Sequence, residues 1–187
     1  KLDENTPLLT DALNHGLAQA LDRMFLLLAL KYAPKTIDLV RQNLTVASAT
    51  SRANAVELLD NLLSKDEKPL MIPLIEDSTP ERKFQAMADV FGLARSDRKA
   101  RLEQLLTAPN DWLQACAARA VSMWKMQDLH SHIVTMLDSR NAICRETALS
   151  ALRDLEEPEA FAQHIAQLRD DPAPLVSRYV QYNLQQA

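Results

Sequence analysis

Glycine is nearly absent from this chain of 187 residues, which contains only Gly16 and Gly92. Tight hairpins and phosphate-binding loops need glycine where φ is positive or where the backbone approaches another group closely. Two glycines supply few such positions, so the composition favours an all-α fold. The hydrophobic content of 47% is high enough for a buried core and excludes a disordered chain.

Cysteine is also scarce, and the chain has no net positive charge. Cys116 and Cys144 stand alone and form no CxxC pair, which favours reduced core thiols in a reducing compartment and no metal site. The formal charge is −4, with 21 basic and 25 acidic residues spread along the chain. No continuous basic surface is expected to neutralise phosphates, so neither DNA nor RNA is expected as a partner.

Long hydrophobic runs are missing as well. The longest, from Met24 to Leu30, is far shorter than the ~20 residues needed to cross a bilayer, and no signal sequence opens the chain. We therefore expect a cytoplasmic location. If the parent protein is in an inner membrane, we expect a domain outside this segment to hold it there and this segment to lie on the cytoplasmic side. Because the chain begins at Lys1, we expect it to be a fragment of a longer protein.

Internal repetition is the most informative feature that the sequence does contain. Five segments share the pattern of Arg or Ala, two residues, a small residue and then Leu. With their first residues aligned, the steps along the chain are 30, 33, 30 and 33 residues, the aligned positions being Arg52, Arg82, Ala115, Arg145 and Arg178. Small residues such as Ala55, Ala118 and Ala148 follow three positions later, where they allow close helix packing.

An apolar-periodic segment precedes each repeated segment, so every repeat is predicted to be a pair of helices. These first helices are expected at Thr36–Val46, Lys68–Ile75, Arg98–Leu106, Leu129–Leu137 and Ala160–Leu168. Most prolines fall between helices or in first turns, where a missing amide hydrogen does little harm. Pro73 is the exception, and it predicts a short or kinked helix.

A long helix is predicted ahead of the array, with Thr6 as its N-cap and Pro7 as its first residue. Its leucines at 13, 17, 21 and 28 form a stripe that we expect to be buried against the first repeat, because a terminal repeat needs a cap. The prediction is a single domain over 1–187, with a capping helix at 6–32 and helix pairs at 33–64, 67–92, 96–125, 127–155 and 157–187.

These residues resemble the HEAT-repeat family, in which a helix ends in Asp and a second helix carries Arg and small residues. The pattern is seen in IEDSTPERKFQAM, MLDSRNAICRETALSAL and LRDDPAPLVSRYV. The resemblance implies an α-α superhelix, a HEAT-like solenoid of about five helix pairs. A narrower resemblance, carried by ALDRMFLLLALKY and DWLQACAARAV, is to HEAT regions of bacterial membrane proteins with an ATP/ADP-carrier-like or major-facilitator-like domain, often with a cyclic-nucleotide-binding domain.

The candidate binding residues are Arg52, Arg82, Arg145, Arg178 and Trp112. In a HEAT stack the second helices line the concave surface, which would expose the arginines to a ligand. Alternatively, each arginine pairs with a preceding acid in a structural ladder: Asp77 with Arg82, Asp138 with Arg145, and Asp171 with Arg178. Trp112 is either a binding contact or part of the packing.

Chemistry-bearing motifs are lacking. No P-loop, nucleophile elbow or HExxH occurs, so we expect no enzyme activity, no catalytic residue and no cofactor. His130 and His132 lie two residues apart and point to different sides of a helix, and neither His15 nor His164 has a Cys or carboxylate at a ligand spacing.

The predicted function is a non-catalytic scaffold that binds a protein or a sister domain of the same chain, as a regulatory or coupling segment of a transporter-like protein. The alternative is a small-molecule or nucleic-acid site on the concave surface.

Overall fold

A computed structural model describes residues 6–46 and 48–185, and these residues form helices and turns without a strand. The fold class is therefore all-α, as the composition predicts. The helices are α1 (Pro7–Lys31), α2 (Pro34–Thr45), α3 (Ala49–Leu62), α4 (Lys68–Ile75), α5 (Pro80–Phe91), α6 (Arg98–Leu106), α7 (Asp111–Met123), α8 (His130–Thr135), α9 (Ala142–Leu155), α10 (Pro158–Gln167) and α11 (Pro174–Leu184), with 3₁₀ turns η1 (Gln127–Leu129) and η2 (Met136–Asp138) on either side of α8.

The individual helices follow the apolar periodicity closely. The predicted bounds of α4 and α6 coincide with the observed ones, and the long helix at 6–32 is observed as α1. The expected short helix at Pro73 is confirmed, since α4 has only eight residues and carries this proline inside it. The segment Leu129–Leu137 is helical but broken, because 3₁₀ turns flank the six residues of α8. α5 ends at Gly92 with φ of 64°, the left-handed C-cap that glycine adopts without strain.

The starts of α3, α5, α7, α9 and α11 recur at a nearly constant interval. A side-chain oxygen caps the first four of these helices and accepts a backbone N–H at each cap, and the N-cap residues in order are Ser48, Thr79, Asn110, Asn141 and Ala173. The steps between them are 31, 31, 31 and 32 residues. The predicted alternation of 30 and 33 is therefore wrong. Arg52 and Arg145 both lie four residues past their caps, but Arg82 lies three past and Arg178 five past.

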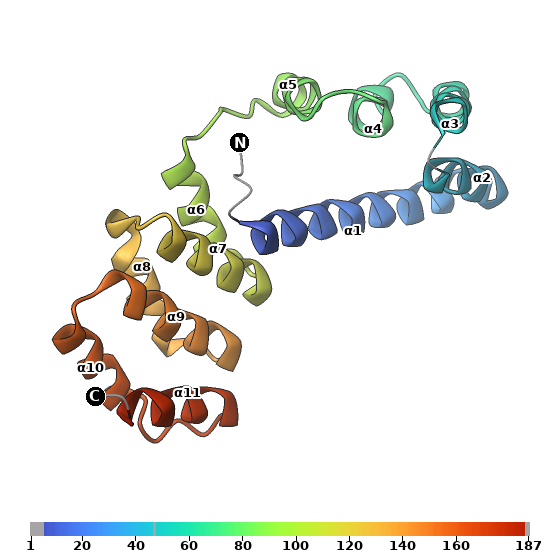
Figure 1. Ribbon diagram of the computed structural model, residues 1–187. Coiled ribbons are helices and arrows are strands. Elements are labelled where there is room, and N and C mark those ends of the chain that lie inside the picture. Colours follow the sequence, from blue (N-terminus) through green and yellow to red (C-terminus); the bar gives the residue numbers. More distant parts are fainter. Residues whose placement is uncertain (1–5, 47, 186–187) are drawn as a thin grey trace. The chain divides into compact units, whose positions relative to one another are not determined.

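The chain divides into two compact units (Figure 1). The terminal unit comprises Lys1–Gly16 together with Ser96–Ala187, and the inserted unit comprises Leu17–Arg95. The division falls inside α1, so this helix contributes its first turns to one core and its last turns to the other. Stacked repeats contact only their neighbours, so two compact units also arise within a single array, and the prediction of one domain stays a prediction.

In the terminal unit, α7 packs along α9 and α9 packs along α11, with α6, α8 and α10 against them (Figure 1). Small side chains on α7 and α9 allow these two helices to approach closely, and the fully buried ones are Ala117, Ala118, Ala148 and Ala151. Bulky apolar side chains, such as Leu129 and Ile133, complete the core of this unit. Leu9 and Ala12 of α1 belong to the same core.

In the inserted unit, Phe25 and Leu28 at the end of α1 pack in a core with α2, α3 and α4. α5 packs on α4, but none of its residues is buried. The predicted apolar stripe on the long helix is divided. Leu28 is buried and Leu13 packs on the core of the terminal unit, whereas Leu17 is 54% exposed. The expectation that the whole stripe is buried is thus wrong at Leu17, because the helix passes from one core to the other at that point.

Within the described part of the chain, no helix combines the length and the apolar composition that a membrane crossing requires.

Candidate functional site

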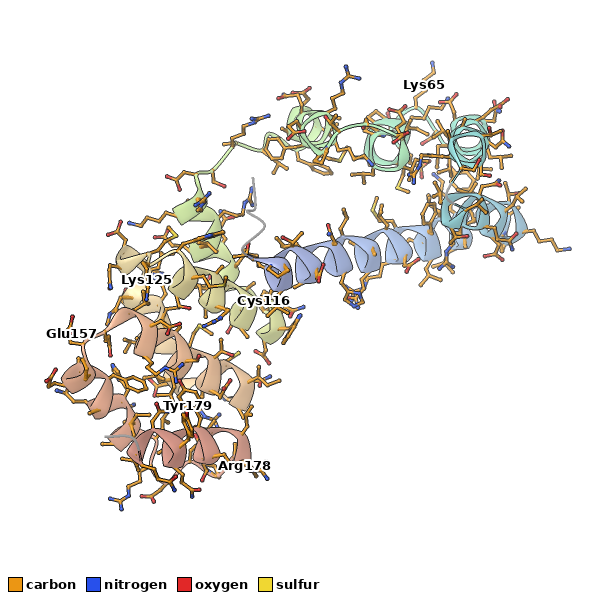
Figure 2. The ribbon with its side chains drawn as sticks, viewed as in Figure 1. Lys65, Cys116, Lys125, Glu157, Arg178 and Tyr179 are labelled. Atoms are coloured by element: carbon orange, nitrogen blue, oxygen red, sulfur yellow. The ribbon has the colours of Figure 1, made fainter. Side chains whose placement is uncertain are left out.

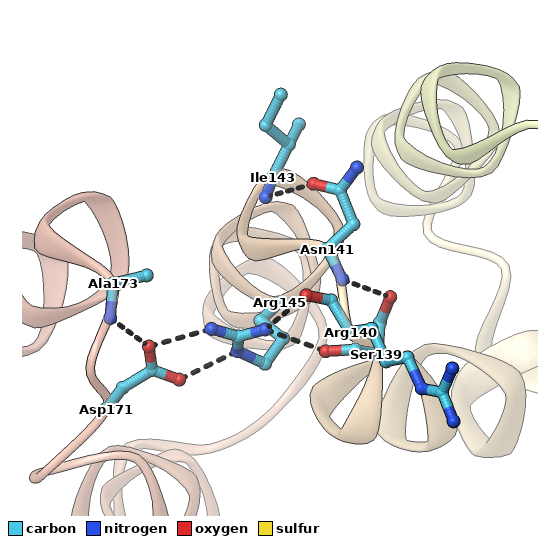
Figure 3. A network of polar contacts seen from close by, with 7 residues as sticks. All are labelled: Ser139, Arg140, Asn141, Ile143, Arg145, Asp171 and Ala173. Carbon is cyan, nitrogen blue, oxygen red and sulfur yellow. Dashed lines mark hydrogen bonds and ion pairs between the residues drawn. The ribbon is translucent and has the colours of Figure 1, made fainter.

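Arg145 is the most firmly held of the predicted site residues (Figure 3). Its Nε and Nη2 donate to the two carboxylate oxygens of Asp171, at 2.7 and 2.8 Å. Its Nη1 donates to the carbonyls of Ser139 and Arg140. The two side chains are only 12% and 3% exposed. The hydrogen bonds from the guanidinium lower the pKa of Asp171, whose Oδ1 also accepts the amide of Ala173. Arg145 is therefore a structural clamp that joins the start of α9 to the turn before α11.

A structural donor recurs at the position of Arg145 in the register set by the caps. Four residues past the caps of α3, α5 and α7 lie Arg52, Lys83 and Gln114. They donate to backbone carbonyls at distances of 3.0, 2.9 and 2.6 Å, and the acceptors are Ile75, Leu74 and Ala108. A donor at this position satisfies a carbonyl at or just past the end of a neighbouring helix, where α-helical partners run out. Arg52 is thus engaged in holding the fold.

Arg82 and Arg178 are both exposed and do not occupy this position. In α11, Arg178 points away from α9 whereas its neighbour Tyr179 faces it (Figure 2). The predicted pairing of Arg145 with Asp138 is wrong, because Arg145 forms its ion pair with Asp171, which comes later in the chain. A bidentate pair satisfies both partners at once, which leaves Asp171 engaged and Arg178 at the surface.

Trp112 lies on the surface of the terminal unit, where it is 50% exposed. It stands two residues past the cap of α7, and the same position of α9 and α11 carries Ile143 and Leu175. These side chains are 43% and 46% exposed. Since α7 packs on α9 and α9 on α11, the three exposed side chains lie at equivalent positions of adjacent helices. We call Trp112, Ile143 and Leu175 the apolar row.

A groove adjoins the apolar row along α7. It consists of two cavities of about 200 and 190 Å³ that share Leu8, Cys116 and Arg119. One cavity extends toward Trp112 and α9, where its wall carries Thr147 and Ser150. The other extends toward Met123 and the first turn of α1, and its lining is almost wholly apolar. The groove thus has small, wettable side chains at one end and an apolar trough at the other.

Charges of both signs line the groove. Arg119 Nη1 lies 3.0 Å from Asp154 Oδ2, and these side chains are 43% and 31% exposed. Glu146 stands in the wall near Trp112, and its burial raises the pKa of its carboxyl. A buried carboxylate is costly when it lacks a partner, so Glu146 is a favourable position for a basic group brought by a ligand.

The two cysteines are buried and free. Burial raises the pKa of both thiols, so they stay protonated at neutral pH and lack the thiolate character of reactive cysteines. Cys116 contributes to the floor of the groove as a small apolar side chain. Cys144 Sγ contacts the carbonyl oxygen of Asp111 at 3.4 Å.

Sequence reasoning missed one polar cluster, which joins His130, Glu156 and His164. Glu156 is 8% exposed at the end of α9, and one of its oxygens meets Nε2 of both histidines, that of His164 at 3.1 Å. The other oxygen, Oε2, has no partner among the described residues. No local spacing announces this cluster, because its members come from three different helix ends. Across the described residues, no three potential metal ligands are grouped so as to hold an ion.

Comparison of the chain with models of protein families, with curated proteins and with solved structures finds no match in any of the three.

Proposed function

We propose that this protein is a non-catalytic scaffold whose terminal unit binds a segment of another protein, or of a sister domain, along the apolar row and its groove. The apolar row carries the proposal. Exposed apolar side chains scattered singly are ordinary, but large ones at equivalent positions of three adjacent helices form a patch of the kind that marks interaction sites. Trp112 fits this role best, since tryptophan is enriched among the residues that dominate binding energy.

The groove supports a polypeptide ligand. Its two cavities are each below the ~300–1,000 Å³ of drug-sized sites, but together they extend along α7 from Trp112 to Met123. A segment lying there meets Trp112 and polar side chains at one end, an apolar trough at the other, and charges of both signs from Glu146 and Arg119. Such alternation suits a chain with apolar anchors and a polar backbone.

The cap positions support the finer proposal of a HEAT-like solenoid of about five helix pairs. The side-chain caps of α3, α5, α7 and α9 recur every 31 residues, which fits stacked helix pairs of equal length, whereas the cap of α11, Ala173, has no capping side chain. The resemblance to HEAT regions of transporter-like membrane proteins adds the proposal that the scaffold is a cytoplasmic regulatory or coupling segment. In that case the bound partner is a neighbouring domain of the same assembly.

The test is quantitative co-purification of partners with the tagged chain from its native cells, with the membrane and soluble fractions analysed separately. The double variant Trp112→Ala, Ile143→Ser removes the centre of the apolar row, and Leu30→Ser is the control because Leu30 is 85% exposed in the inserted unit. We expect a partner retained by the wild type and the control and depleted at least fivefold by the double variant. Equal recovery by all three, with unchanged circular dichroism, would contradict the proposal.

The alternative of a nucleic-acid ligand predicts a different outcome in the same experiment. Recovered nucleic acid that is lost in high salt, with no protein depleted by the double variant, would favour it.

A further inference from the structure

Another cavity of the terminal unit shares no residue with the apolar row. Its volume is about 270 Å³, and residues from the first turns of α1, from one face of α6 and from the end of α7 line it. The floor is apolar. Leu9 and Leu102 are almost fully buried there, and Leu13, Leu105 and Trp124 complete it. Apolar surface of this kind binds the hydrocarbon part of a ligand.

The rim of the cavity carries two guanidinium groups, those of Arg98 and Arg101, on the exposed first turn of α6. Neither forms an ion pair with a carboxylate of the described chain. Arg101 donates only to the uncharged amide oxygen of Gln104, at 3.1 Å. The one acid of the rim, Asp97, uses its Oδ1 to accept the amide of Ala100 as the cap of α6. The rim therefore carries two positive charges and one negative charge, and neither guanidinium is paired with the carboxylate.

Trp124 forms part of the wall of the cavity. The guanidinium of Arg98 lies over its ring, with Cζ 4.5 Å from the ring centroid. The indole Nε1 is buried, and no acceptor reaches it within the described structure. The two guanidinium groups at the rim call for an acceptor with a negative charge.

We propose that this cavity binds a small amphipathic carboxylate, whose apolar body lies on the leucine floor and whose carboxylate pairs with Arg98 and Arg101. Planar carboxylates match the forked donors of arginine in a bidentate arrangement. The volume is below that of drug-sized sites, so the apolar body is a short alkyl chain or a single aromatic ring. This site is independent of the apolar row, from which it differs in its residues and in the class of its ligand.

The test uses the indole N–H resonances of the whole ¹⁵N-labelled protein. The chain has only two tryptophans, so Trp124 reports on the cavity while Trp112 is an internal control on the apolar row. The Trp112→Phe variant assigns the two signals. Octanoate and 3-phenylpropionate are titrated as probes, and octylamine is the matched cation with the same alkyl chain.

We expect a saturable shift of the Trp124 signal with the carboxylates, no comparable shift of Trp112, and none with octylamine. The double variant Arg98→Met, Arg101→Met keeps the apolar contacts and should weaken carboxylate binding at least tenfold. Leu105→Phe, which narrows the cavity without changing charge, should weaken it as well. The absence of a saturable Trp124 shift would overturn the proposal. So would a shift that octylamine reproduces or that the arginine substitutions leave unchanged.

Discussion

The two units solve the problem of helix packing differently. In the terminal unit, alanines with no exposed surface allow α7 and α9 to approach closely, and a buried ion pair joins α9 to the turn before α11. In the inserted unit, bulky side chains make the core, α5 buries nothing, and the ion pairs are solvent-exposed. Exposed pairs contribute little because water and salt screen them. The inserted unit is therefore expected to open more readily than the terminal unit.

The largest effect is expected from a cavity in either core. Leu149→Ala in the terminal unit and Leu59→Ala in the inserted unit each remove a side chain with no exposed surface. Each should lower the free energy of unfolding of its own unit by about 2–5 kcal/mol. Hydrogen exchange read by mass spectrometry locates the loss of protection. If either substitution deprotects both units equally, they unfold as one and the comparison fails.

A smaller loss is expected when the buried clamp is broken. Arg145→Met leaves the Asp171 carboxylate without its partner and should cost about 2–3 kcal/mol, below the range for a fully buried pair because Arg145 retains 12% exposure. Arg178→Met is the matched control, since the side chain is exposed, and it should change stability by less than ~0.5 kcal/mol. Urea unfolding measures both. Equal effects of the two variants would show that the clamp does not stabilise the terminal unit.

Replacing Glu146 is expected to stabilise the terminal unit, by an amount that depends on pH. Burial raises the pKa of this carboxyl in the folded state, so folding penalises the charged form. The penalty is absent at low pH and sets in as the pH rises through the ordinary pKa toward the folded one. Glu146→Gln should therefore stabilise the terminal unit at pH 7, by up to about 1 kcal/mol, and have no effect at pH 3. Glu57→Gln is the exposed control, and a pH-independent gain would contradict this account.

The smallest effect concerns acid sensitivity in the inserted unit. Glu67 accepts hydrogen bonds from Lys31, Ser64 and Tyr32, which lower its pKa to about 2 from an ordinary value of 4.5. The resulting stabilisation is present above the ordinary pKa and is lost as the pH falls through the folded one. Melting temperatures between pH 6 and 2 should therefore fall more for the wild type than for Glu67→Gln. Asp38→Asn, another exposed acid of the same unit, should melt like the wild type at every pH.

Apolar periodicity and capping residues predicted most of the helices, because both are local properties of the chain. The sequence alignment differs from the caps at three segments, since Arg82, Ala115 and Arg178 align with Arg52 and Arg145 in sequence but lie at other distances from their caps. The capping residues Thr79, Asn110 and Asn141 carried the correct period all along. A search for Ser, Thr or Asn at helix starts would have found it.

The partners of the polar side chains could not be predicted, because they depend on which helix ends meet in space. Arg145 bonds to Asp171 and not to Asp138, and Glu156 gathers two histidines from other helices. Trp112 was predicted to be either a binding contact or part of the packing, and it is half exposed; its companions Ile143 and Leu175 emerged only after the caps were aligned. The functional role of the apolar row stays a prediction.

The division of the chain inside α1 has a consequence during protein synthesis. Leu9 and Ala12 leave the ribosome before the rest of their core, such as Leu102 and Val121, which follows some 90 residues or more later. At ~5–20 residues per second this delay is roughly 5–20 s. The inserted unit is synthesised within that interval and is complete by its end, while the first turns of α1 wait with their apolar face uncovered. The nascent chain thus has a defined period in which a chaperone, or a second nascent copy, can reach that face.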